Sequence, residues 1–200
     1  MRDTVLNLIE DWMRPWMMTT IDFDTAVNYV LANELGLEID PSDPGGITNM
    51  GISLRFLRNV SPESLKRAGI FEPVGEQTIR NLTLDQAKLL YRSEFWDKAS
   101  FDRIMNQNLV NYLFDCTVNM GLTQAVKCIQ RACWAIMNDR QSLTDDGNLG
   151  NKTLDAINQS GFYLLPVLRA ERAGFYRRLV ALDPSRNNDL KDWLNRSYKI

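Results

Sequence analysis

Apolar side chains recur at the spacing that places them on one face of a helix along most of the chain. This pattern predicts helices over residues 22–34, 53–60, 83–97, 109–120, 123–136, 164–182 and 189–196, and a further helix opened by Ser61-Pro62-Glu63. Residues 37–52 contain too much Asp, Pro and Gly to stay helical, and they predict a short loop or β-hairpin. The sequence therefore predicts a mainly α fold with one small β element.

The first 18 residues carry Trp and Met at helical spacing, with Pro15 placed to bend or end the helix. We expect this helix to pack on the body of the protein; the alternative is contact with a membrane surface or a partner through residues 5–18. Asp3, Glu10 and Asp11 interrupt the region where a signal peptide needs an unbroken apolar stretch. No apolar run approaches the ~20 residues that span a bilayer. We therefore expect synthesis in the cytoplasm without a signal peptide.

The composition narrows the classes of function. The 200 residues include 44% hydrophobic side chains, enough for a core, and the formal net charge is -2 without a long basic run. Nucleic-acid binding through phosphate neutralisation is therefore disfavoured. The chain contains no His, which excludes His-based triads and most zinc enzymes and leaves carboxylates as the acid and base groups. We expect a monomer that needs no cofactor and no metal.

Glu34 is the strongest candidate for a catalytic residue, because it ends the helix predicted over residues 22–34 and a Gly-rich loop follows it. A general acid for glycoside cleavage must keep its proton near neutral pH. Burial against Leu31, Leu35 and Leu37 would raise the pKa of the Glu34 carboxyl group, and so would the negative end of the helix dipole. The pattern favours acid-assisted cleavage of a glycosidic bond.

The loop after Glu34 offers partners for this acid. Asp43 lies nine positions later, far enough for a turn to bring its carboxylate across a cleft, and Thr48 follows five positions after Asp43. The carboxylate could orient or deprotonate a water that the hydroxyl helps to hold. The alternative gives Asp43 a structural role in the turn before Pro44, and Asp40 is expected to have only such a role. Gly46 supplies tight backbone geometry, with close approach of a sugar as a second role.

A later turn, at residues 145–150, contains Asp, Gly and Asn, as calcium-binding loops do. Counting from Gly147, however, Thr153 stands where such a loop needs a closing Glu. We therefore expect a structural turn, with Asn151 near the start of the next helix.

Three ordered blocks of the sequence carry a resemblance to a known family. They are Phe23-Asp24-Thr25-Ala26-Val27 through Glu34 with residues 40–52, residues 82–88 with Tyr91 and Phe95-Trp96-Asp97, and residues 113–121 with Ile129-Gln130-Arg131-Ala132. These blocks resemble glycoside hydrolase family 108, which comprises lysozyme-like N-acetylmuramidases found as phage endolysins and as secretion-associated bacterial proteins. Residues 146–154 and Trp193-Leu194-Asn195-Arg196 are similar to the predicted peptidoglycan-binding region that usually follows this catalytic domain. The resemblance covers about residues 20–198.

The resemblance implies a lysozyme-like helical fold with the small β element directly after the catalytic helix. It implies an N-terminal amphipathic extension (1–19), a catalytic region (20–118) and a peptidoglycan-binding-like region (119–200) packed on it. Glu34 takes the place of the family's catalytic Glu, and the order of Glu34, Asp43 and Thr48 is similar to the Glu-Asp-Thr triad of phage-type lysozymes. The residues expected to contact the sugar are Gly46, Asn49, Tyr91 and Asn119.

The resemblance further implies a peptidoglycan hydrolase that cleaves the β-1,4 bond between N-acetylmuramic acid and N-acetylglucosamine. Protonated Glu34 would donate to the leaving oxygen, while a water held by Asp43 and Thr48 attacks the anomeric carbon. Such an enzyme acts on glycan strands in the periplasm or cell wall, after export or holin-type release. Two alternatives stay open: a lytic transglycosylase, which needs no hydrolytic water, and a peptidoglycan-binding or secretion-accessory protein with impaired catalysis. The last depends on Glu34-Leu35-Gly36-Leu37, where the family normally has Glu-Gly-Gly-Tyr.

Overall fold

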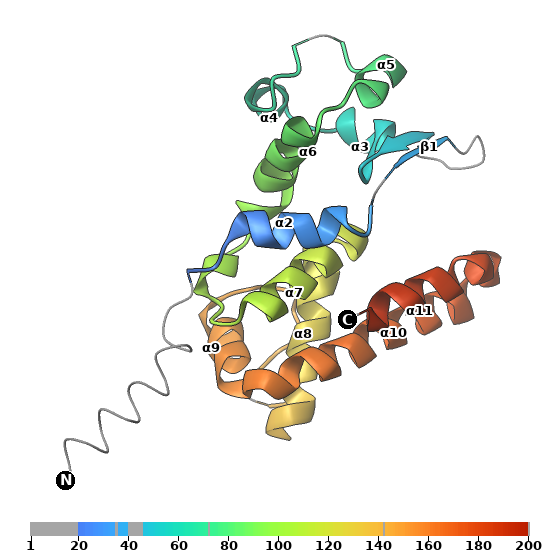
Figure 1. The fold of residues 1–200 in the computed structure, drawn as a ribbon. Helices are drawn as coiled ribbons and strands as arrows, with labels where there is room; N and C mark the ends of the chain where they lie inside the picture. The colour runs from blue at the N-terminus through green and yellow to red at the C-terminus, as the bar shows by residue number, and fades with distance from the viewer. Residues whose placement is uncertain (1–19, 35, 40–45, 72, 142, 200) are drawn as a thin grey trace, which may run out of the picture.

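The computed structural model describes residues 20–34, 36–39, 46–71, 73–141 and 143–199. In Figure 1, α2 lies between two parts of the molecule: one carries the small sheet with α3 to α6, and the other is formed by α7 to α11. The described residues are predominantly helical, which confirms the predicted mainly α, lysozyme-like fold. The predicted N-terminal helix and Asp43 lie outside the described residues, as do Leu35 and Asp40.

The α-helices of the described residues are α2 (Phe23–Leu31), α3 (Leu54–Leu57), α4 (Pro62–Arg67), α5 (Glu76–Arg80), α6 (Leu84–Tyr91), α7 (Gln107–Met120), α8 (Leu122–Met137), α9 (Asn151–Ser160), α10 (Leu164–Leu182) and α11 (Leu190–Tyr198). A π-helical segment, η2 (Arg92–Trp96), continues α6. The short 3-10 segments are η3 (Phe101–Arg103), η4 (Gly161–Tyr163) and η5 (Pro184–Asn188).

The β element is a three-stranded antiparallel sheet in the order β1 (Leu37–Ile39), β2 (Ile47–Asn49) and β3 (Ile52–Ser53). Thr48 in the central strand lies opposite Glu38 of β1 and Ser53 of β3. The turn from β2 to β3 uses two residues with positive φ, Met50 at 49° and Gly51 at 74°. The predicted hairpin is therefore present, and a third strand, β3, extends it into a sheet.

The local signals in the sequence account for most helix boundaries. The Asp22 carboxylate caps α2 by accepting from the backbone N–H groups of Asp24 and Thr25. The predicted capping box of α6 is formed, because Gln86 N donates to Thr83 Oγ1 at 3.2 Å and Thr83 N donates to Gln86 Oε1 at 3.0 Å. The prediction that α2 reaches Glu34 is wrong: the helix ends at Leu31, and Glu34 follows in a bend.

An aromatic cluster joins α2 to the helices that follow the sheet. The ring of Phe23 in α2 packs edge-on against Trp96 at 5.3 Å and against Phe114 at 6.1 Å between centroids. Trp96 and Phe114 also pack against Phe101, which is fully buried. Edge-to-face pairs at these separations stabilise by about 0.5–1.5 kcal/mol beyond their buried area. This packing fixes α2, and with it the position of Glu34 just beyond its end.

The C-terminal helices α8, α10 and α11 pack together beside α7 (Figure 1). The turn predicted at residues 145–150 is held by the buried Gln130 of α8, which donates to Asp146 Oδ1 at 2.9 Å and accepts from Gly147 N at 3.0 Å. Asn148 N also donates to Asp146 Oδ1, at 2.8 Å. The polar groups of this turn are thus used within the fold, and Asn151 begins α9 as predicted.

Candidate active site

Glu34 lies three residues beyond α2, where its backbone N–H donates to the carbonyl of Leu31 at 3.1 Å. Its side chain is largely covered, with 21% of its surface exposed. The turn between β2 and β3 covers one side: a Cβ atom placed on Gly51 would lie 3.0 Å from Glu34 Cγ and 3.1 Å from Glu34 Cβ. Only glycine fits this close approach without displacing the Glu34 side chain.

Tyr91 of α6 holds the same turn by a hydrogen bond. Its side chain is fully buried, and its hydroxyl donates to the carbonyl oxygen of Met50 at 2.9 Å. Burial, and next the charge of Glu34, raises the pKa of the Tyr91 hydroxyl, so the group remains a donor. A Cβ atom on Gly51 would come within 2.3 Å of this hydroxyl. Tyr91, expected to contact sugar, therefore sets the position of the turn that packs against Glu34.

The other side of Glu34 is covered by the C-terminal helix. Arg196 of α11 forms an ion pair with the Glu34 carboxylate through Nη1. The same guanidinium donates to Asp115 of α7, from Nη2 to Oδ1 at 2.7 Å and from Nε to Oδ2 at 3.1 Å. Arg196 thus binds one carboxylate that lies just beyond α2 and another on α7.

Asp115 is fully buried, and its carboxylate accepts hydrogen bonds from three side chains. Besides Arg196, it accepts from Arg172 Nη1 of α10 at 2.7 Å and from Asn33 Nδ2 at 3.2 Å. Burial alone would raise the pKa of Asp115, but the bonds from Arg196 and the charges of Arg172 and Arg196 outweigh it and lower the pKa. We call Glu34, Arg196, Asp115 and Arg172 the ion chain; it joins the end of α2 to α7, α10 and α11.

The environment of Glu34 suits a group that must keep a proton. Burial raises the pKa of the Glu34 carboxyl group, and the charges of Asp115 and Glu38 act in the same direction. Arg196 opposes them, through both its charge and its hydrogen bond, yet the net direction is upward. Because of its burial, Glu34 therefore accepts a proton more readily than a solvated Glu does, even though it is paired with Arg196.

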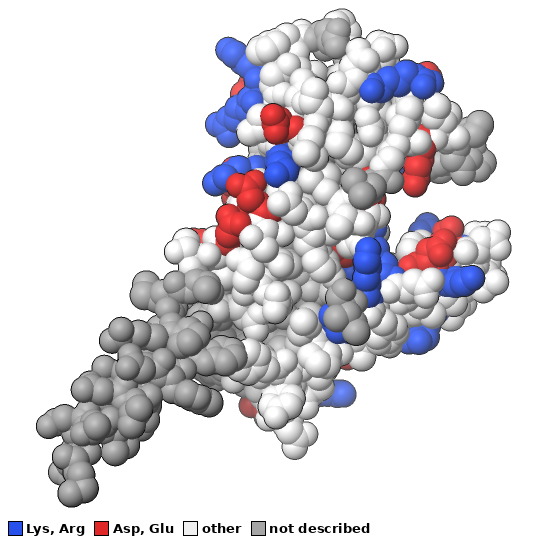
Figure 2. All heavy atoms as spheres, viewed as in Figure 1, with Lys and Arg blue, Asp and Glu red and all other residues white. Residues whose placement is uncertain are grey.

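Figure 2 shows the surface hollowed between the part that carries the sheet and the part that carries α10 and α11; we call this the interlobe hollow. Acidic side chains lie on its sheet side, and side chains of both charges lie on the helix side (Figure 2). Glu34 contacts Gly51 on the sheet side and Arg196 on the helix side. It therefore lies between the β2–β3 turn and α11.

The remaining predicted site residues within the described ranges lie in two places: Gly46, Thr48 and Asn49 in or directly before β2, and Asn119 on α7. Thr48 lies half-buried at the centre of the sheet, and Gly46, with φ of 73°, is exposed just before β2. Asn49 donates from Nδ2 to the carbonyl of Ile79 at 3.0 Å, so its side chain holds the sheet to α5. Because side chains alternate along a strand, Thr48 points to the opposite face.

Asn119 lies exposed near the end of α7, where its Oδ1 accepts from the hydroxyl of Tyr176. Tyr176 in turn accepts from Arg172 Nε at 3.3 Å, so Asn119 is linked to the ion chain rather than to the sheet. Sequence reasoning missed Asp115, Arg172 and Arg196. The available signal was the acidic Asp115 in the middle of a helix predicted to be buried, since a buried charge needs a partner.

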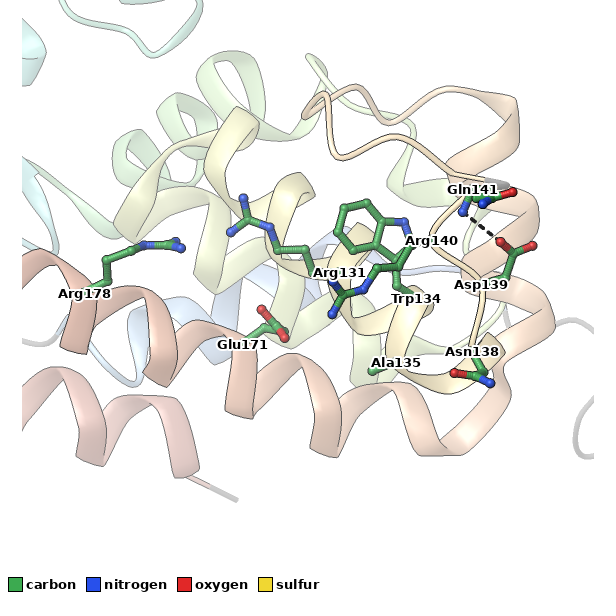
Figure 3. A pocket seen from close by; sticks show the side chains of 9 residues that line it. All are labelled: Arg131, Trp134, Ala135, Asn138, Asp139, Arg140, Gln141, Glu171 and Arg178. Atoms are coloured by element: carbon green, nitrogen blue, oxygen red, sulfur yellow. Dashed lines mark hydrogen bonds between the residues drawn. The ribbon is translucent and has the colours of Figure 1, made fainter.

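A second, polar hollow lies in the C-terminal region, between the end of α8, residues 138–141 and α10 (Figure 3). Its volume is about 730 Å³, and Glu34 is not part of its lining. Arg131 is held there by Asp145 at 2.8 Å, and the Trp134 ring is fixed by its Nε1 donating to the carbonyl of Leu143 at 2.6 Å. The guanidinium of Arg140 lies 6.0 Å from the Trp134 ring centre, within cation–π range. This hollow is separate from the site around Glu34.

Comparison with known proteins divides the chain near the junction of α7 and α8. Residues 27–121 match the family model described as Glycosyl hydrolase 108, and residues 124–198 match the one described as Predicted Peptidoglycan domain. The solved structure of Brucella abortus SagA is similar over 88% of this chain and 92% of that chain, with a TM-score of 0.61 and 24% sequence identity. No curated protein matches the chain.

The fold and these matches define a glycoside hydrolase with a peptidoglycan-directed C-terminal region. The match of residues 27–121 to the glycosyl hydrolase family 108 model confirms the resemblance seen in the sequence. It is a peptidoglycan hydrolase. None of the helices within the described ranges is both long and apolar enough to cross a membrane.

Proposed function

We propose that the chain is an N-acetylmuramidase, which hydrolyses the β-1,4 bond between N-acetylmuramic acid and N-acetylglucosamine. Glu34 is the general acid that protonates the leaving glycosidic oxygen. The observation that carries this proposal is the Glu34 carboxyl group itself, which is largely buried, has a raised pKa and lies between the β2–β3 turn and Arg196 of α11. A carboxyl group in such a setting can stay protonated until the sugar oxygen takes the proton.

Asp43 and Thr48 complete the proposed site by holding the attacking water. Thr48 lies on the sheet face opposite to the one that Asn49 uses to bind α5, which leaves its hydroxyl available for this role. If Asp43 acts on a water, its carboxyl group should lie roughly 6.5–9.5 Å from that of Glu34, and the reaction should invert the anomeric centre. Polarimetry, or NMR of the first-formed anomer, tests the stereochemistry.

Within this proposal, residues 20–118 form the catalytic region and residues 119–200 the peptidoglycan-directed region. The wall in the periplasm is the place of action, and glycan strands are the substrate. The match of residues 124–198 to a predicted peptidoglycan domain supports this assignment.

The deciding experiment compares wild type with Glu34→Gln on purified peptidoglycan and on cells stripped of their outer membrane. Glu63→Gln is the matched control, because Glu63 is an exposed Glu on α4, away from Glu34. We expect Glu34→Gln to lose nearly all lytic activity and Glu63→Gln to keep it. Equal lysis by wild type and Glu34→Gln would remove Glu34 from the mechanism.

Mass spectrometry of the released muropeptides identifies the reaction. New reducing N-acetylmuramic acid ends are expected from hydrolysis at the proposed bond. Anhydro ends would instead assign the chain to the lytic transglycosylases, and binding to peptidoglycan without products would indicate an accessory protein.

A further inference from the structure

The match to two consecutive family models suggests a catalytic unit followed by a separate wall-binding unit. The ion chain crosses that boundary. Glu34 and Asp115 belong to the residues matched by the first model, whereas Arg172 and Arg196 belong to those matched by the second. The two acidic residues of the ion chain therefore come from the region matched by the first model, and the two Arg residues come from the region matched by the second. Neither region contains the whole ion chain.

We propose that Arg196 is a positioning residue that holds the Glu34 carboxyl group in its working orientation, so that the C-terminal region is part of the active site. This inference rests on the role of Glu34 in the proposed function. Arg196 contacts the Glu34 carboxylate directly, and its own position is fixed by two hydrogen bonds to Asp115. A planar guanidinium held in this way presents a fixed donor, which a flexible Lys cannot reproduce.

Arg172 and Asn33 fix the position of Asp115, the carboxylate that binds Arg196. Arg172 is fully buried and donates to Asp115 at 2.7 Å, with its guanidinium 5.2 Å from the centre of the Tyr112 ring. Asn33, next to Glu34 in sequence, donates to Asp115 and accepts from Lys199 Nζ at 2.7 Å. The orientation of Arg196 is thus determined by contacts that lie on its side away from Glu34.

The charges of the ion chain also affect the pKa of Glu34, the proposed general acid. With Glu34 ionised, the two carboxylates balance the two guanidinium groups; with Glu34 protonated, one positive charge remains. The titratable groups that act on Glu34 are Arg196 from α11, Asp115 from α7, Glu38 from β1 and Tyr91 from α6. Among them Arg196 alone is a cation, so its removal should raise the pKa of Glu34.

The experiment compares Arg196→Gln and Arg196→Lys with wild type, and uses Lys191→Gln as control. Lys191 is exposed on the same helix, so its replacement removes a positive charge without touching the ion chain. Arg196→Gln should still fold, because Asp115 keeps its bonds from Arg172 and Asn33. Circular dichroism and thermal unfolding of each variant establish that it is folded before activity is measured.

Two readouts are needed. The first is the pKa of the Glu34 carboxyl group by carbon-13 NMR titration, with its signal assigned from Glu34→Gln; it does not depend on activity. We expect an upward shift on the order of 1–3 units in Arg196→Gln. A smaller change is expected in Arg196→Lys, which keeps a positive charge next to Glu34. No change is expected in Lys191→Gln, which leaves Arg196 in place.

The second readout is the pH profile of lysis. Since Glu34 acts in its protonated form, the alkaline limb should move to higher pH in Arg196→Gln, while the maximal rate falls on the order of 10- to 100-fold through loss of orientation. Arg196→Lys should recover part of that rate.

An unchanged Glu34 pKa together with an unchanged pH profile in Arg196→Gln would overturn the inference, and any loss of thermal stability would then be the whole effect of Arg196. A shifted pKa in a chain whose Glu34→Gln variant still lyses walls would instead reject the proposed role of Glu34. The two failures are therefore distinguishable.

Discussion

Gly51 lies directly against the side chain of Glu34, and any larger residue at position 51 would displace it. A Cβ atom there would stand 3.0 Å from Glu34 Cγ and 2.3 Å from the Tyr91 hydroxyl. The φ angle of 74° adds a second constraint, because it lies in the left-handed region that glycine adopts without strain. Glycine is therefore required at position 51 for two reasons: the backbone has a positive φ, and the Glu34 and Tyr91 side chains leave no room for a Cβ atom.

We predict that Gly51→Ala loses lytic activity while Gly69→Ala retains it. Gly69 has nearly the same φ, 73°, but a Cβ atom there meets nothing within 4 Å. Both variants should lose about 1–2 kcal/mol of unfolding free energy from the left-handed backbone. Only Gly51→Ala should displace Glu34, with a fall in rate on the order of 100-fold. Urea unfolding and the lysis assay measure the two effects; equal activity of the two variants would show that the Gly51 contact does not matter to Glu34.

Asp115 should be far more important for stability than an ordinary acidic residue. Asp115→Asn leaves the guanidinium groups of Arg172 and Arg196 close together without the carboxylate that binds both. Breaking a buried ion pair from one side typically costs about 3–5 kcal/mol. The half-exposed pair of Asp145 with Arg131 gives the comparison, because Asp145→Asn should cost at most about 1 kcal/mol. Similar losses in urea unfolding would indicate that the ion chain contributes no more than a surface pair.

The dependence of stability on pH follows from the same residue. The pKa of Asp115 is lower in the folded than in the unfolded chain, so the stability it contributes is present above the unfolded value of about 3.9. This contribution disappears as the pH falls through the lower, folded pKa. Unfolding free energies measured between neutral and acidic pH should thus fall more steeply for wild type than for Asp115→Asn.

Local signals made much of the fold predictable. The helix expected over residues 164–182 is α10, and the capping box at Thr83 opens α6, because periodicity and capping act within a few residues. The end of α2 was misplaced, since Asn33 and Glu34 carry no local stop signal and bind instead to partners on α7 and α11. Glu34 stands out in sequence because a glycine-rich loop follows it.

The surroundings of Glu34 could not be predicted from the same signals. Asp115 and Arg196 are 81 positions apart, and their pairing depends on how α7 and α11 pack. The contact of Gly51 with Glu34 likewise depends on the geometry of a turn, which a single Gly does not determine. Long-range polar contacts have no periodic pattern, although a charged residue within an apolar helix indicates that one is needed.

Gln130 should be required for the turn at residues 146–148. Its amide donates to Asp146, to the Asn148 carbonyl and to Thr153, and its oxygen accepts from Gly147 N. Gln130→Met removes all four bonds from a buried position, and the groups left without partners should cost about 1–3 kcal/mol. Faster amide hydrogen exchange at Gly147 checks that the loss is local.

Gln124→Met is the control on the same helix, because the one hydrogen bond that the Gln124 side chain makes within the described residues is a contact of 3.5 Å with Cys128 Sγ. Its effect on unfolding free energy should stay within about 0.5 kcal/mol. If both variants were equally stable, the turn would be held by its own backbone contacts rather than by Gln130.

Glu34→Gln should lose activity and gain stability at neutral pH. The folded state raises the pKa of Glu34, so between the unfolded value of about 4.3 and the folded value the folded chain binds more protons than the unfolded one. Wild-type stability therefore declines as the pH rises through this window, because burial penalises the ionised carboxylate more than Arg196 compensates. Gln carries no charge and escapes this penalty, so the difference in melting temperature should shrink as the pH falls toward 4.3. A variant less stable than wild type at pH 7 would mean that the pairing with Arg196 outweighs the cost of burial, which would place the Glu34 pKa below its ordinary value and weaken its case as a general acid.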